Sequence, residues 1–387
     1  MDKQTYTREE PAGFIERAGV RYYRRLFEKS ATGEAETIRI DNLPPDNTLR
    51  FLSRDISHFA AVVAFFIGAC TSLATVWIVA NYSHTLDTGA YYALLIGATL
   101  LLVIIEFGVL FWLSLRTVHV IACLTQHHRD ADDPFLPGDD AVSNLLARAA
   151  LELPDPVVHY LGVDPLKYVS KPKLFLVGFL YKAKVFLTSV AAKFLLRRMA
   201  GKLVLRIGLA WVSVPVAGIW NALVMYRVAR EARLRLFGHR LVSYLIDDLL
   251  TEEFVVQLSE QAKEGAIRAI STMMVMTQNY HPNMLMLLVK FSETLAIEDQ
   301  GDYDDWPKFV WLLSQVTAAE RFFLLDLLCV AAAFDAHLSS LQRQQLPLVF
   351  GEYTDQYMHR IKDLKGLMLT GRIHAAKELC RLDFQPG

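Results

Sequence analysis

Two long apolar segments with a short polar connection dominate the hydropathy pattern of the chain. Residues 59–80 contain no charged side chain, and residues 90–115 contain one, Glu106. At about 1.5 Å per helical residue, each segment is long enough to cross a hydrocarbon core of about 30 Å. The connection, residues 81–89, is too short to form a domain. The pattern predicts an antiparallel transmembrane hairpin whose second helix continues to about residue 126.

Positive charge is distributed unevenly around this hairpin. The 57 residues before it carry ten Lys and Arg, the connection carries none, and Arg116 follows the second segment at once. Because cytoplasmic flanks of membrane helices are enriched in Lys and Arg, both termini are expected in the cytoplasm. The first apolar segment begins too late for a cleaved leader, so the hairpin itself is expected to direct insertion. We therefore predict localisation in the cell inner (cytoplasmic) membrane of a bacterial-type cell.

The remaining chain is patterned mainly for helices, and we predict an all-α protein with a cytoplasmic helical bundle. Apolar residues at helical spacing predict a helix over residues 254–276, with Thr251 as its cap. Residues 37–41 alternate and could form a short strand. Capping-box spacing marks two further helix starts, Thr317 with Glu320 and Ser339 with Gln342.

Composition divides the chain into five segments. They are an N-terminal cytoplasmic helix and linker (1–57), the transmembrane hairpin with its helical extension (58–126), an acidic linker with a short helix (127–164), basic amphipathic membrane-associated helices (165–240) and the bundle (241–387). The net charge of the whole chain is −1, but residues 165–240 carry 15 Lys and Arg against one Glu. Such a local excess predicts an anionic partner. Residues 241–387 carry 12 Lys and Arg against 20 Asp and Glu, so we expect them to dock on a basic partner or to fold back on the basic segment. A protein partner or a homo-oligomer is expected for the whole chain.

The basic segment contains two apolar stretches, residues 174–196 and 203–226, with positive charge at both ends and in their connection. This distribution favours helices that lie on, or dip into, an anionic lipid surface. A second spanning hairpin and a buried hairpin of a soluble domain are the alternatives. Nucleic acid is not expected, because the segment is too apolar for a face that tracks phosphates. The basic residues expected at the membrane surface are Lys182, Lys184, Arg197, Arg198, Lys202, Arg227 and Arg230.

Glu106 is the one ionisable residue within the two hairpin segments. An acidic side chain at membrane depth is costly and is a functional hypothesis by default. The alternative is a carboxyl that fixes helix packing or oligomerisation. Because the two segments offer no second acid, His or Lys, a proton relay has no next group, and the structural interpretation is favoured.

Metal and catalytic chemistry have little support in the sequence. His127, His128 and Asp130 begin an acidic stretch that contains metal-ligand types, although its spacing fits no defined metal loop and a solvated linker explains it. The acidic residues between 298 and 305 are likewise interpreted as a solvated loop. The four cysteines lack metal or redox spacing and are expected to be buried, reduced thiols. Nucleotide-binding, zinc-protease and hydrolase motifs are absent. We expect no cofactor and no enzymatic activity; a hydrolase using residues 127–140 is a remaining alternative.

Residues 214–222, Val-Pro-Val-Ala-Gly-Ile-Trp-Asn-Ala, resemble a segment of the EcsC-like family. That segment contains Pro and Gly and ends in Gly-x-x-Asn-Ala. The resemblance covers about fifty residues. It implies peripheral membrane association and no established reaction.

A second resemblance lies in the C-terminal third. An Ala-rich stretch at residues 331–333 is followed by Phe334, Asp335 and then Ser339, which is similar to the TerB-like (tellurite-resistance) helical domain. The family pattern has Asp-Gly where this chain has Asp335-Ala336. The resemblance implies that acidic residues at this turn bind divalent metal, and Asp335 alone carries over. The alternative is a turn residue that bonds its own backbone.

These observations favour a membrane-anchored scaffold or sensor, with a role in envelope or stress response. The alternative is a subunit of a membrane transport or channel complex that uses Glu106.

Overall fold

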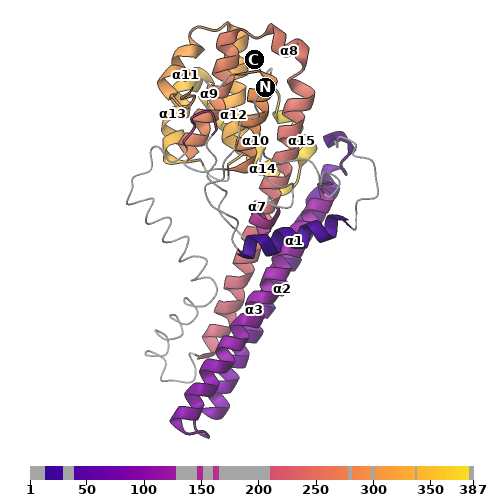
Figure 1. Ribbon diagram of the computed structural model, residues 1–387, viewed down its shortest axis with the longest axis vertical. Coiled ribbons are helices and arrows are strands. Elements are labelled where there is room, and N and C mark those ends of the chain that lie inside the picture. The colour runs from indigo at the N-terminus through magenta and orange to yellow at the C-terminus, as the bar shows by residue number, and fades with distance from the viewer. Residues whose placement is uncertain are drawn as a thin grey trace. The chain divides into compact units, whose positions relative to one another are not determined.

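The computed structural model describes residues 14–28, 39–127, 146–150, 160–164, 210–277, 281–297, 301–335 and 338–382. Regular structure in these residues is helical, with one isolated β-bridge between Tyr160 and Val163, so the all-α prediction is confirmed for this part of the chain (Figure 1). The chain forms two compact units. The hairpin unit comprises Asp55–Thr117 and Val169–Ala229, and the bundle unit comprises Met1–Arg54, Val118–Tyr168 and Arg230–Gly387.

Two helices of the hairpin unit are long and apolar enough to cross a membrane, as the hydropathy pattern predicts. They are α2 (Asp46–Tyr82) and α3 (Thr88–Leu124). Only 28% and 11% of their most apolar windows are buried within the chain, whereas a core helix of a soluble protein buries most of its length. α2 begins twelve residues before the predicted start at residue 58, because no Gly or Pro interrupts the polar residues that follow Asp46.

A third helix packs against this pair. α7 (Ser213–Tyr244) follows a 3₁₀ turn, Ala210–Val212 (η3), and its first half belongs to the hairpin unit. Met225 of α7 lies in one buried cluster with Ala60, Ala64 and Leu113. α7 also runs without interruption through residue 240, where the sequence pattern placed a segment boundary. A short π-helical turn, Leu245–Leu249 (η4), follows it.

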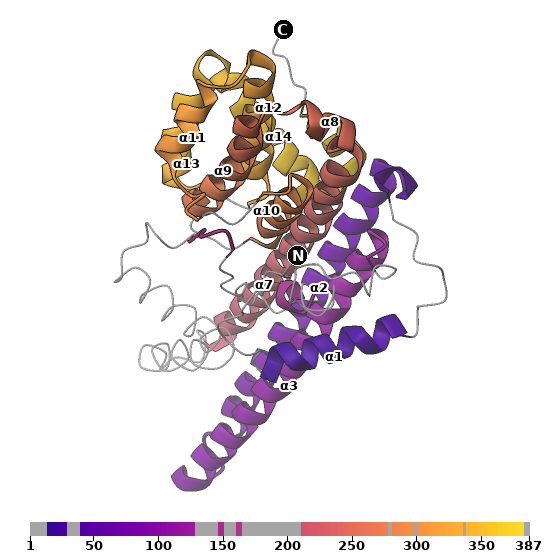
Figure 2. The same cartoon turned by 45° about the horizontal axis from the view of Figure 1, so that its top comes forward.

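The bundle unit is built around α9 (Glu260–Thr277), which contacts α10, α11, α12 and α13, while α14 packs on α12 (Figure 2). Burial of apolar side chains on these helices supplies its main driving force. The other helices are α8 (Glu252–Gln257), α10 (Pro282–Thr294), α11 (Trp306–Leu313), α12 (Ala318–Ala333), α13 (Ser340–Phe350), α14 (Thr354–Thr370) and α15 (Ile373–Leu379), with a 3₁₀ turn at Gly351–Tyr353 (η5).

Helix starts in the bundle unit test the capping predictions. Both capping boxes are present, with Thr317 at the start of α12 and Ser339 at the start of α13. The single helix predicted over residues 254–276 is wrong. Thr251 caps only the short α8, the chain becomes extended at Leu258, and Ser259 starts α9 by accepting a hydrogen bond from the Ala262 amide.

N-terminal residues contribute directly to the bundle unit. α1 (Phe14–Glu28) carries Glu16, which forms a buried ion pair of 3.1 Å with Arg148 in the helical residues 146–150. The strand expected over residues 37–41 is not formed by its described part, because a 3₁₀ turn, Ile40–Asn42 (η1), begins at Ile40. At the first residue of α2, both carboxylate oxygens of Asp46 accept 2.9 Å hydrogen bonds from the amides of His374 and Ala375. The start of α2 therefore holds the start of α15.

A buried ion pair joins α12, α14 and the C-terminal residues. Arg360 donates from Nη1 to Asp326 Oδ1 at 2.5 Å, and Tyr357 donates to the same oxygen at 3.2 Å. The other nitrogens of Arg360 donate to the backbone carbonyls of Leu379 and Arg381. Removing one member of a buried pair leaves the other charge without compensation.

We predict that Asp326→Ala destabilises the protein by about 3–5 kcal/mol, because it leaves the Arg360 guanidinium buried without its counter-ion. The measurement is the free energy of unfolding in detergent micelles. Glu378→Ala is the matched control, because its partner Arg381 lies in an exposed pair, with side chains 65% and 60% exposed. A loss for Asp326→Ala no larger than the control would contradict the prediction.

Candidate functional site

Three helices of the hairpin unit meet at Glu106. The carboxyl lies on α3 and is only 4% exposed. Asn221 on α7 donates from Nδ2 to Glu106 Oε1 at 2.7 Å, and Thr71 Oγ1 on α2 lies 3.0 Å from Glu106 Oε2. We call these residues the Glu106 site. It joins three segments that are far apart in the sequence through one side chain.

Glycines allow the helices to approach closely enough for these bonds. A Cβ atom at Gly68 of α2 would lie 2.6 Å from the Ala217 carbonyl oxygen and 2.5 Å from Asn221 Nδ2. A Cβ atom at Gly218 of α7 would lie 2.7 Å from the Phe65 ring. All three separations are shorter than real Cβ contacts, so larger residues would push α7 away from α2. The small residues thus position Asn221 against Glu106.

The hydroxyl of Thr71 connects the carboxyl to the backbone. Its Oγ1 lies 3.1 Å from the Gly68 carbonyl oxygen as well as 3.0 Å from Glu106 Oε2, but a hydroxyl has one proton to donate. A protonated Glu106 can donate to Thr71 Oγ1, which then donates to the Gly68 oxygen. A glutamine at residue 106 can make the same pattern, with its amide nitrogen as the donor to Thr71 and its oxygen as the acceptor from Asn221.

The surroundings of the Glu106 site are apolar. Residues 59–80, 90–115 and 210–226, which are all described, contain no Asp, Glu, His, Lys or Arg other than Glu106. A second polar contact lies at the next residue of α2, where Ser72 Oγ is 3.0 Å from Ser213 Oγ. The arrangement can hold helices together and can accommodate a proton. Its described part offers no chain of titratable groups through which a proton would move.

The basic residues expected at a membrane surface are only partly within the described chain. Arg227 and Arg230 follow the apolar half of α7; Arg227 is exposed and Arg230 is half-buried. Lys182, Lys184, Arg197, Arg198 and Lys202 lie outside the described residues.

The weak metal candidates do not form a cluster in the described chain. Among the described residues, no three His, Cys, Asp or Glu side chains are placed to hold one metal ion. Asp335 follows α12 and is buried, and His127 follows α3 and is buried. His128 and Asp130 lie outside the described residues.

His127 has a histidine partner that the sequence pattern did not indicate. Its Nε2 lies 3.0 Å from Nδ1 of His239, and its Nδ1 lies 2.7 Å from Thr125 Oγ1. Arg240 donates to the Thr125 carbonyl oxygen at 2.9 Å. Burial, together with the positive charge of Arg240 and Lys290, holds the pKa of His239 well below its usual range. This part of the bundle unit therefore contains neutral imidazole that serves packing and hydrogen bonding.

The cysteines divide into two kinds. Burial raises the pKa of Cys329 and of Cys380 to about 12, as expected of inert buried thiols. The expectation of burial is wrong for Cys70, which is exposed on α2, and Cys123 is half-buried with its sulfur 3.6 Å from His119 Nε2.

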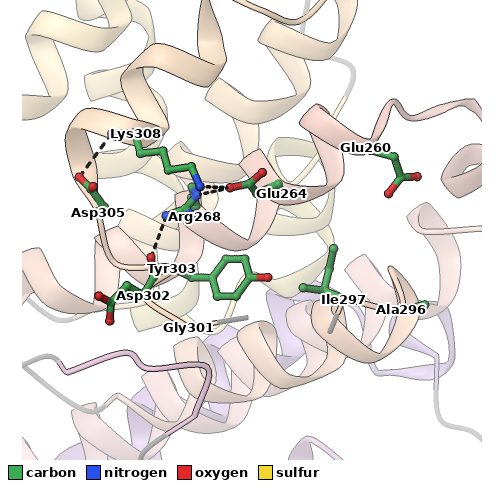
Figure 3. Close-up of a pocket in the computed structure, with 10 residues that line it drawn as sticks. All are labelled: Glu260, Glu264, Arg268, Ala296, Ile297, Gly301, Asp302, Tyr303, Asp305 and Lys308. Atoms are coloured by element: carbon green, nitrogen blue, oxygen red, sulfur yellow. Dashed lines mark hydrogen bonds and ion pairs between the residues drawn. The ribbon is translucent and has the colours of Figure 1, made fainter. Parts of the chain in front are cut away.

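A polar cavity of about 690 Å³ lies in the bundle unit between α9, α11 and the turn that precedes α11 (Figure 3). Glu264 Oε1 is 2.8 Å from Arg268 Nε and 2.9 Å from Lys308 Nζ. Burial raises the pKa of Glu264, but hydrogen bonds from Lys308 and Arg268 outweigh it and hold that pKa below its ordinary value. Glu264 thus engages both cations, and Glu260, Asp302 and Asp305 add further carboxylates to the lining, so the cavity is not arranged to bind an anion.

The acidic turn beside this cavity agrees only in part with the solvated loop expected from sequence. Asp302 and Asp305 are exposed, whereas Asp304 is buried, and Asp305 caps α11 by accepting a hydrogen bond from the Lys308 amide. Residues 298–300 lie outside the described residues. The Arg268 guanidinium lies 5.1 Å from the ring centroid of Tyr303 and donates to the Asp302 carbonyl oxygen. These contacts hold the turn on α9.

His281 makes the bundle unit sensitive to acid. It is 1% exposed, and neither ring nitrogen has a hydrogen-bond partner among the described residues. Burial lowers the pKa of His281 to about 4, although Glu231 opposes the change and Arg235 adds to it. Between pH 6.5 and about 4 the unfolded chain binds a proton that the folded chain excludes. Stability is therefore fully present above pH 6.5 and falls with decreasing pH across this window.

We predict that lowering the pH from 7 to about 4 costs about 3 kcal/mol of stability through His281, and that His281→Phe removes most of this dependence. The measurement is the thermal midpoint in detergent as a function of pH. The control is His359→Gln, because His359 is exposed on α14 with its side chain 73% accessible. Equal acid slopes for the native chain and His281→Phe would show that the prediction is wrong.

Comparisons of the chain with protein-family models, with curated proteins and with solved structures gave no match. The TerB-like and EcsC-like resemblances therefore remain predictions that rest on their motifs. The structure shows on which helices those motifs lie. Residues 214–222 belong to α7 and include Asn221 of the Glu106 site, while residues 331–335 close α12 and Ser339 caps α13.

Proposed function

We propose that this chain is a membrane-anchored helical scaffold or sensor of a bacterial-type inner membrane. The observation that carries the proposal is the Glu106 site. Glu106 is engaged by Thr71 and Asn221 from two other helices, at bond lengths of 3.0 and 2.7 Å. A carboxyl held in this way stabilises a helix assembly, as interhelical hydrogen bonds do in lipid.

Exposed apolar side chains support a membrane as the surroundings of the hairpin unit. Phe59, Phe66, Trp77, Ile96 and Ile104 are all more than half exposed. Contiguous apolar surface of this extent marks a membrane or protein interface, because its exposure to water is unfavourable. The length of α2 and α3 favours the bilayer as that partner.

The bundle unit is then the cytoplasmic part, and both termini are cytoplasmic. Its cavity is polar with paired charges, and its buried histidines pack within the unit, so neither supports a catalytic role. Its acidic surface suits a protein partner, and the resemblance to a tellurite-resistance domain suggests a stress or envelope response. A transport or channel subunit is the second candidate, and Glu106 is the residue that it would use.

The topology is tested with single cysteines in intact cells. In a background lacking Cys70 and Cys123, we expect an impermeant maleimide to label Ser83→Cys from outside and Val256→Cys only after permeabilisation. Val256 is a suitable site because it is 81% exposed on α8. Cys329 and Cys380 remain in place, since burial raises the pKa of both to about 12 and keeps them unreactive. External labelling of Val256→Cys would refute a cytoplasmic bundle.

The role of Glu106 is tested by two substitutions. We expect Glu106→Gln to preserve assembly and thermal stability, because its amide can keep both hydrogen bonds. Glu106→Leu should lose about 1–2 kcal/mol, since Thr71 and Asn221 then lack their partner. Proton flux is measured in parallel in vesicles that contain a pH-sensitive dye. Flux in the native chain that Glu106→Gln abolishes without loss of fold would favour the transport candidate.

A further inference from the structure

The first half of α7 carries an apolar face that is exposed in the part of the chain that the structure describes. Val216, Ile219, Trp220 and Leu223 are 53%, 52%, 46% and 51% exposed. Their spacing of three, four and seven residues places them on one side of the helix. Asn221 lies among them in sequence but is 3% exposed and bonds to Glu106. The helix therefore has one face on the hairpin and an apolar face turned outward.

Contacts along the helix give its direction relative to α2. Met225 packs with Ala60 and Ala64, whereas further along α2 Ser72 lies 3.0 Å from Ser213. As residue numbers rise on α2 they fall on α7. Helix α7 is therefore antiparallel to α2 over this stretch.

The same contacts give a depth for the start of α7. Ser72 is 13 residues beyond the start of the apolar segment 59–80, which corresponds to about 20 Å along a helix at 1.5 Å per residue. If α2 crosses a hydrocarbon core of about 30 Å, Ser213 lies roughly two thirds of the way across it. The charged end of the same stretch, Arg227 and Arg230, is then near the cytoplasmic surface.

We propose that residues 213–226 of α7 are inserted into the hydrocarbon core beside the hairpin, with Val216, Ile219, Trp220 and Leu223 against lipid acyl chains. The inference rests on the proposed membrane anchor and extends it from two helices to three. It also assigns Arg227 to the anionic headgroups of the inner leaflet.

Lipid is favoured as the occupant for two reasons. The exposed apolar side chains of α7 belong to the same compact unit as those of α2 and α3, so the same surroundings are expected to cover both. The change from 17 residues without charge, 210–226, to Arg227 and Arg230 matches the boundary between hydrocarbon and a negatively charged surface.

The test is nitroxide accessibility in vesicles of phosphatidylcholine and phosphatidylglycerol. A spin label is placed by Val216→Cys in the full chain with Cys70 and Cys123 replaced by Ala. A label at Phe66→Cys on α2 serves as the reference for the hairpin, because Phe66 is 60% exposed in the native chain. A label at Val256→Cys on α8 serves as the reference for exposure to water. Ile219→Cys repeats the measurement on the same face of α7, and circular dichroism verifies that each variant is folded.

We expect the label at Val216→Cys to show a ratio of oxygen to nickel-chelate accessibility several-fold above that of Val256→Cys and similar to that of Phe66→Cys. If the accessibility ratio at Val216→Cys is like that at Val256→Cys while Phe66→Cys reports lipid, the inference is overturned. The two-helix anchor would then remain intact. Low accessibility to both reagents would show that protein covers the face, which also overturns it. If Phe66→Cys reports water as well, the proposed anchor itself fails.

Discussion

The hairpin unit depends on the close contact of α7 with α2 at Gly68 and Gly218. A Cβ atom at Gly68 would lie only 2.6 Å from the Ala217 carbonyl oxygen, so the helices can approach this closely because residue 68 is glycine. This proximity lets Asn221 reach Glu106 at 2.7 Å. In the proposed membrane anchor, hydrophobic burial would give little net drive between helices, so packing and hydrogen bonds would hold the contact. The glycines thus allow the close approach of the helices, and this approach allows the hydrogen bond of Asn221 to the Glu106 carboxyl.

The bundle unit is held together differently. Its helices bury apolar faces on α9 and α12, which in water supplies most of the stabilisation. The buried pair of Asp326 and Arg360 adds less net stability than its charges suggest, because both lose hydration. The pair instead fixes the position of the chain after α15, because Arg360 also binds the carbonyls of Leu379 and Arg381. A misplaced α14 would leave this cation buried without partners.

The sequence predicted those features that depend on local pattern. The length of the apolar segments indicated α2 and α3, and the spacing of Thr317 and Ser339 indicated two helix starts. The break before α9 was missed because its reason is tertiary: the Ser259 amide bonds to Glu320 of another helix at 2.8 Å. A hydropathy pattern carries no information about a hydrogen-bond partner that is distant in the sequence.

The candidate site shows the same limit. Glu106 was evident from sequence because it is the single charge in a long apolar segment. Asn221 is 115 residues away, and nothing in the spacing pairs the two. Polar residues such as Thr71 and Asn221 within apolar stretches were the available signal, since a buried amide needs a hydrogen-bond partner. The pair of His127 with His239 was missed for the same reason, because 112 residues separate them.

Helix α2 satisfies requirements of both units with one continuous run of sequence. At its first residue Asp46 accepts hydrogen bonds from the start of α15, and 25 residues later Thr71 contacts Glu106. Helices α3 and α7 likewise contribute residues to both units. Residues that pack the hairpin unit and residues that hold the start of α15 in the bundle unit therefore belong to the same helical segment.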